Sequence, residues 1–176
     1  VLFMCHSYVA QISASTNKRT VAILDLTINN AEISEAEIFS ITHMLKTAGI
    51  PFLTTSNVNT AKNCGFIIAF SKFDTNTFTA TEKDSLISYV NKGGILIAPN
   101  MRDPYFNSLF GVSANLNSNA RYTVSFNYFL GDPSFKWLND TMEQTISLGR
   151  NTYTAVINSR NYTTAGALSL AVFDDN

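Results

Sequence analysis

The chain has 176 residues and a mass of 19.4 kDa, which is enough for one domain whose core needs no disulfide. Its 12 basic and 13 acidic residues give a net charge of −1, and no Lys/Arg run occurs, so we expect no nucleic-acid partner. The 13 Phe and 7 Tyr argue against disorder, and no apolar run reaches the ~20 residues of a transmembrane span.

Residues 1–14 resemble the second half of a secretory signal peptide. The segment VLFMCHSYVAQISA contains no Lys, Arg, Asp or Glu, and Ala10 and Ala14 both offer cleavage points. An additional strand or helix of the fold is the alternative interpretation. Cys5 is a poor lipoprotein anchor, because the large Met4 precedes it where a small residue is usual. We therefore expect a secreted or periplasmic protein.

The first half of the chain alternates strand patterns with amphipathic helix patterns. Apolar runs of strand length occupy residues 20–26, 65–70 and 94–98, as is typical of strands buried on both faces. Capping residues at their starts and glycines after their ends delimit two helices, over residues 34–48 and 81–92. We expect the three apolar strands to be adjacent and parallel in the centre of the sheet.

The second half of the chain has a less regular pattern. Asp103-Pro104 predicts a short helical turn that ends near Phe110-Gly111. Further along, the pattern predicts a half-covered strand, then a helix with Trp137, Leu138, Met142 and Ile146 on its apolar face, and finally two strands. Their ranges are 121–128 for the strand, 133–149 for the helix, and 153–158 and 165–173 for the last two strands.

These elements predict an α/β fold with a doubly wound, mostly parallel sheet flanked by helices. A single domain would cover residues 18–176, since neither a repeat nor a linker-like change of composition occurs after residue 20. An apolar strand pattern runs almost to Asn176, so we expect the natural protein to continue into a further domain.

Loops that follow the apolar strands contain the candidate ligand-binding residues. In open α/β sheets ligands bind beyond the carboxyl ends of the strands. Two such loops carry charged and amide side chains that suit a small polar ligand, namely Lys72, Asp74, Asn100, Arg102 and Asp103. The alternative interpretation is structural, with Asp103 as a helix N-cap and Lys72 as a solvated loop charge.

Motifs for cofactors, metals and nucleophilic catalysis are missing from the sequence. No phosphate-binding glycine motif occurs, and the histidines are His6, in the leader-like segment, and His43, in the middle of a predicted helix. Cys64 precedes a buried strand instead of following one, which favours a core or rim position over a nucleophile. We therefore predict no catalytic residue, no metal and no cofactor.

Residues 82–100, EKDSLISYVNKGGILIAPN, resemble the hallmark stretch of class I glutamine amidotransferase-like domains. In that family a helix ending in Tyr-Val-x-x-Gly-Gly leads into a strand whose end carries the nucleophile. Tyr89–Gly94 and Ile95–Ala98 match this pattern, and the resemblance extends over about residues 20–111. It implies a flavodoxin-like, glutamine amidotransferase-like sheet.

The sequence lacks the catalytic residues of the family that it resembles. The turn after the strand reads Pro99-Asn100-Met101-Arg102 and lacks the family's Cys, and no His follows His43. Similar non-catalytic domains occur in secreted carbohydrate-processing proteins, beside polysaccharide deacetylase modules. The resemblance therefore implies a non-catalytic domain of a secreted or periplasmic multidomain protein. Such a domain would bind a ligand, with carbohydrate as the expected class, or support a neighbouring catalytic domain.

Two other functions remain open from the sequence. One is a carbohydrate hydrolase that uses paired carboxylates such as Asp74 and Asp103, provided that they face each other across a pocket. The other is a protein-interaction module, suggested by 19 Asn, 19 Thr and 17 Ser and by the aromatic strand Tyr122–Tyr128.

Overall fold

The computed structural model of the chain describes residues 19–26, 35–70, 72–73, 75–98, 100–121, 123–126, 145–147, 157–167 and 171–173. The signal-like segment 1–14, Asp74, and the start of the helix expected after Asp132 lie outside these residues. Within the described ranges, no helix combines the length and the apolar character needed to cross a membrane.

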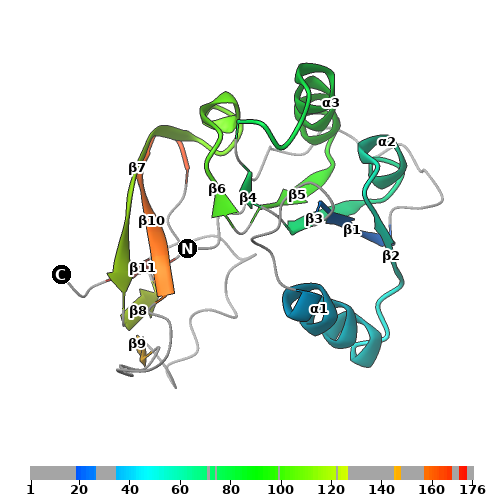
Figure 1. The fold of residues 1–176 in the computed structure, drawn as a ribbon, viewed down its shortest axis with the longest axis horizontal. Helices are drawn as coiled ribbons and strands as arrows, with labels where there is room; N and C mark the ends of the chain where they lie inside the picture. The colour runs from blue at the N-terminus through cyan, green and yellow to red at the C-terminus, as the bar shows by residue number, and fades with distance from the viewer. Residues whose placement is uncertain are drawn as a thin grey trace.

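A parallel four-stranded sheet forms the centre of an α/β fold (Figure 1). Its strands are β1 (Val21–Asp25), β2 (Phe52–Thr55), β3 (Phe66–Phe70) and β5 (Ile95–Ile97), in the order β2-β1-β3-β5. The three apolar runs β1, β3 and β5 are adjacent and parallel, as expected.

The expectation that all three apolar strands lie in the centre is wrong for β5. This strand is the last in the described sheet, and Ile95 at its start is 37% exposed. An apolar run reports that the two faces of a strand are covered, because side chains point to those faces. Whether a strand has a hydrogen-bonding neighbour on each side is a property of its backbone, which the run does not reveal.

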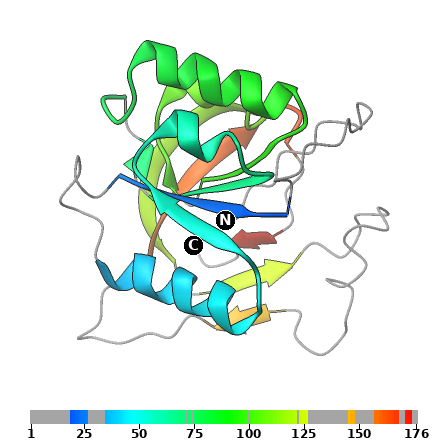
Figure 2. The same ribbon diagram turned by 90° about the vertical axis from the view of Figure 1, so that its right-hand side faces the viewer.

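Helices cover both faces of the sheet: α1 (Glu35–Thr47) on one, α2 (Val58–Ala61) and α3 (Ala80–Asn91) on the other (Figure 2). In β1, Val21 and Ile23 belong to the apolar cluster with Leu45 of α1. Ala22 and Leu24 belong to the larger cluster with residues of α2 and α3. This two-sided burial is the physical reason for the near-continuous apolar run.

Helix α3 has its N-cap two residues before Thr81, where the sequence pattern predicts it. Its N-cap is Thr79, and the Thr79 amide donates to Glu82 Oε2 over 2.9 Å while the Glu82 amide donates to Thr79 Oγ1 over 3.3 Å. A capping box takes Glu or Gln three residues after the cap, and Glu82 meets this condition for Thr79, whereas Thr81 has Asp84 at that position.

The second half of the chain is antiparallel. Strand β7 (Val112–Arg121) pairs with β10 (Ile157–Thr164), and β8 (Thr123–Phe126) lies between β9 (Thr145–Ser147) and β11 (Ala171–Phe173). Ile146 lies in β9 opposite Val124, so the expected helix 133–149 is wrong at its end, because cross-strand pairing overrides the helical spacing of Ile146.

Gly111 connects the two halves of the fold. It follows the short 3-10 helix η2 (Pro104–Phe106), and its φ of +63° lies in the left-handed region. The Gly111 carbonyl accepts hydrogen bonds from Ala165 N at 2.6 Å and from Ala167 N at 2.9 Å. A Cβ atom here would lie 2.6 Å from Ala167 N, so the backbone of the distal segment approaches too closely for any side chain.

We predict that Gly111→Ala lowers the free energy of unfolding by about 3 kcal/mol, since left-handed strain adds to overlap with backbone that cannot rotate away. Gly49→Ala is the matched control, because Gly49 has a φ of +67° but no neighbouring atom within 4 Å of the added Cβ. Gly49→Ala should lower the free energy of unfolding only by the left-handed strain, about 1 kcal/mol. Urea unfolding of both variants measures the difference, and equal losses would contradict the proposed close approach.

Candidate functional site

The carboxyl ends of the parallel strands bring together two of the loops expected to bind a ligand. Beyond β3 and β5 the chain forms a second small parallel pair, β4 (Lys72–Phe73) and β6 (Asn100–Met101). In this pair Lys72 is the register partner of Asn100. The structure therefore places these two predicted residues side by side along the backbone, at the edge of the sheet where ligands bind in such folds.

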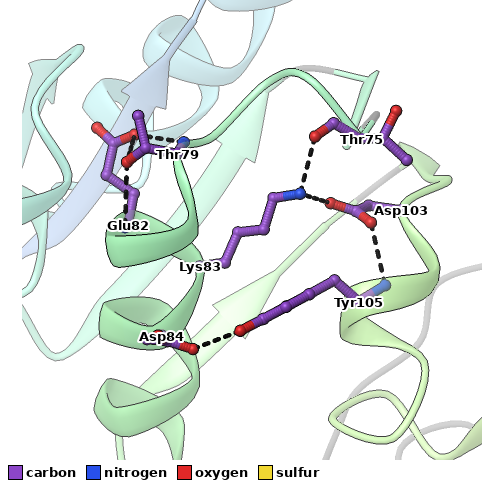
Figure 3. A network of polar contacts seen from close by, with 7 residues as sticks. All are labelled: Thr75, Thr79, Glu82, Lys83, Asp84, Asp103 and Tyr105. Carbon is purple, nitrogen blue, oxygen red and sulfur yellow. Dashed lines mark hydrogen bonds and ion pairs between the residues drawn. The ribbon is translucent and has the colours of Figure 1, made fainter.

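Asp103 occupies the turn that follows β6, and its side chain is buried (Figure 3). Its Oδ2 atom lies 2.6 Å from Nζ of Lys83, which belongs to the first turn of α3. Lys83 Nζ also donates to the Thr75 carbonyl over 2.8 Å. The side chains of Lys83 and Asp103 are only 11% and 3% exposed, so the ion pair is shielded from water.

The other oxygen of the Asp103 carboxylate caps η2. Asp103 Oδ1 accepts a hydrogen bond from the Tyr105 amide over 3.0 Å, which confirms the N-cap role that the sequence indicated. Each carboxylate oxygen thus has a protein partner, and a ligand would reach Asp103 only by displacing Lys83. We therefore assign a structural role to Asp103, which holds the turn. The neighbouring Arg102, another predicted ligand-binding residue, is half-buried.

Tyr105 and Asp84 form the exposed side of this cluster. The Tyr105 hydroxyl donates to Asp84 Oδ1 over 2.6 Å, and this hydrogen bond raises the pKa of Tyr105. Lys83 Nζ lies 5.3 Å from the centroid of the Tyr105 ring, within the range of a cation–π contact. The neighbouring Phe106 ring packs edge-on at a centroid distance of 6.0 Å.

Sequence reasoning did not select Lys83, Asp84 or Tyr105 as site residues. One signal was available, because Lys83 shares a helical face with the buried Leu86 and Val90. A lysine in an apolar stripe needs a partner, since a buried charge is costly when unpaired. The identity of that partner, 20 residues further along the chain, depended on the tertiary structure.

Cys64 and His43 lie away from this cluster. Cys64 lies two residues before β3, at the amino end of the sheet, and is buried in the main core. Burial raises the pKa of its thiol, which disfavours the reactive thiolate. His43 is exposed on α1 and stacks on Phe39 at a ring-centroid distance of 5.9 Å.

Comparison of the chain with protein-family models, with curated proteins and with solved structures finds no match. The geometry of the described residues therefore carries the functional argument. Among those residues, no group of three or more His, Cys, Asp or Glu side chains is arranged to hold a metal ion.

We predict that Lys83→Met lowers the free energy of unfolding by about 3 kcal/mol, because it leaves the buried Asp103 carboxylate without its cation. Lys92→Met is the control at the other end of α3, where the lysine is exposed, and should change stability by less than about 0.5 kcal/mol. Chemical denaturation of both variants tests the difference.

The double variant Lys83→Met with Asp103→Asn should lose less stability than Lys83→Met alone, since it buries no unpaired charge. A double variant that is as unstable as the sum of the two single variants would show that Lys83 and Asp103 are not coupled.

Proposed function

We propose that this chain is a non-catalytic, amidotransferase-like domain of a secreted or periplasmic multidomain protein. It binds carbohydrate at the carboxyl ends of the strands of its sheet, or it supports a neighbouring catalytic domain such as a polysaccharide deacetylase. One observation carries the non-catalytic part of the proposal. Where the family it resembles places a nucleophile, after β5, this chain has a buried Met101 and an Asp103 carboxylate already paired with Lys83.

The strand order supports the proposed location of the ligand. From β1 the chain adds β2 on one side, and it then adds β3 and β5 on the other side. The strand order therefore reverses between β1 and β3, which is the topological switch point. Flavodoxin-like, doubly wound sheets bind ligands in the crevice at such a switch point, beyond the carboxyl ends of the strands. Lys72, Asn100 and Arg102 all follow strands at that edge.

The hydrolase alternative receives less support from the geometry. A carbohydrate hydrolase needs two carboxylates that face each other across a pocket, roughly 5–9.5 Å apart. Asp103 was one of the two candidates, and its carboxylate is buried against Lys83 and the Tyr105 amide. Asp74, the other candidate, lies outside the described residues.

The interaction alternative is favoured by one feature of α1. Phe39 is 69% exposed and Met44 is 57% exposed on this helix, and such apolar side chains suit contact with another protein surface. A role in supporting a neighbouring domain would use the exposed side chains of α1, whereas ligand binding would use the carboxyl ends of the strands.

We predict that the purified chain releases no ammonia from glutamine above the background rate. Cys64→Ser should leave that result unchanged, because the thiol is buried and its raised pKa keeps it protonated. A coupled ammonia assay measures both. Ammonia release that Cys64→Ser abolishes would refute the non-catalytic assignment.

We further predict that soluble oligosaccharides shift the backbone amide resonances of residues 100–103, 105 and 106, near the carboxyl ends of the strands, on titration in a two-dimensional NMR experiment. The amides of Gly65 and Phe66, at the amino end of β3, serve as the internal control and should not move. Shifts confined to the amino end would place the ligand elsewhere, and the absence of any shift would remove carbohydrate as the ligand class.

A further inference from the structure

Tyr105 combines high exposure with a fixed orientation. It is 48% exposed, yet four contacts restrain it. Its hydroxyl donates to Asp84 and its amide donates to Asp103. The Lys83 ammonium lies beside its ring, and the Phe106 ring packs edge-on. Most exposed side chains lose rotamer freedom when they bind a ligand, which weakens binding. Tyr105 is already ordered before any ligand arrives.

The contacts also decide which face of the ring is accessible. Figure 3 shows the ring edge-on between α3 and η2, with Lys83 on one side of it. Lys83 is buried, so the ring face that it contacts is the inner one. The exposed area of Tyr105 therefore belongs to the opposite face and the ring edge.

A carboxylate next to an exposed aromatic face suits a sugar. The C–H groups on one face of a pyranose are apolar and pack on an aromatic ring, while hydroxyl groups at its rim donate hydrogen bonds. Asp84 is exposed, and the Tyr105 hydroxyl occupies its Oδ1 atom, so Oδ2 takes no part in that bond. A carboxylate oxygen is an acceptor for which a sugar hydroxyl is a matching donor.

We propose that Tyr105 and Asp84 form a sugar subsite, in which the outer face of the ring stacks on a pyranose and Asp84 accepts a hydroxyl. This inference rests on the proposed carbohydrate-binding function and names the residues that recognise the sugar. The subsite lies beside the first turn of α3 and the turn after β6, at the same carboxyl edge of the sheet.

Phe39 provides a matched comparison within the chain. It is more exposed than Tyr105, at 69%, but it stacks on His43 on α1 and has no hydroxyl with which to fix its ring to a carboxylate. An effect that needs only an exposed aromatic would appear at both residues, whereas the subsite requires Tyr105.

The test is isothermal titration calorimetry of the chain with cellohexaose, chitohexaose and xylohexaose. Tyr105→Ala should weaken the tightest of these complexes about tenfold or more, and Phe39→Ala should leave its Kd unchanged. Tyr105→Phe retains the stacking face and loses only the bond to Asp84, so it should weaken binding less than Tyr105→Ala. Thermal unfolding of each variant, with a Tm near that of the unaltered chain, confirms that the fold is retained.

Each outcome decides between the two proposals. Binding that persists unchanged in Tyr105→Ala overturns the subsite and leaves carbohydrate binding elsewhere at the edge intact. Equal losses in Tyr105→Ala and Phe39→Ala also overturn the subsite, because they indicate contact with any exposed aromatic. A chain that binds none of the three oligosaccharides overturns both the subsite and the proposed carbohydrate function.

Discussion

The ion pair between Lys83 and Asp103 is the interaction on which the arrangement of the carboxyl edge depends. Removal of two charges from water costs several kcal/mol per ion, and only close geometry with further hydrogen bonds offsets that cost. Here the two charged atoms are 2.6 Å apart, Thr75 accepts a further bond from Lys83, and the Tyr105 amide donates to Asp103. The pair thereby joins the start of α3 to the turn after β6.

This ion pair agrees with the proposed function, which is ligand binding without catalysis at the carboxyl ends of the strands. Lys83 and the Tyr105 amide engage both oxygens of the Asp103 carboxylate, and the thiol of Cys64 is buried at the other end of the sheet. The same ion pair orients Tyr105, because the Asp103 carboxylate accepts a hydrogen bond from the Tyr105 amide and Lys83 lies against the Tyr105 ring. In the proposed subsite, Asp103 therefore holds the turn and Tyr105 contacts the sugar.

The antiparallel half is attached to the sheet close to the same turn. Tyr162 of β10 donates a hydrogen bond to the Met101 carbonyl of β6, and Gly111 accepts from the amides of Ala165 and Ala167. Tyr162 and Ala167 also pack against the main core. The distal strands therefore contact β6 and the residue Gly111 that precedes β7.

The sequence by itself determined the parallel β-α-β half, because buried strands and amphipathic helices leave local patterns such as the apolar run in β1 and the glycine after α1. It also indicated Asp103 as a cap and Cys64 as a core residue. Only the tertiary structure decided that β5 lies at an edge, that the polar sequence of β7 pairs with β10, and that Lys83 meets Asp103. These features depend on contacts between residues distant in the chain, whereas sequence patterns report the environment of each residue and not the identity of its partner.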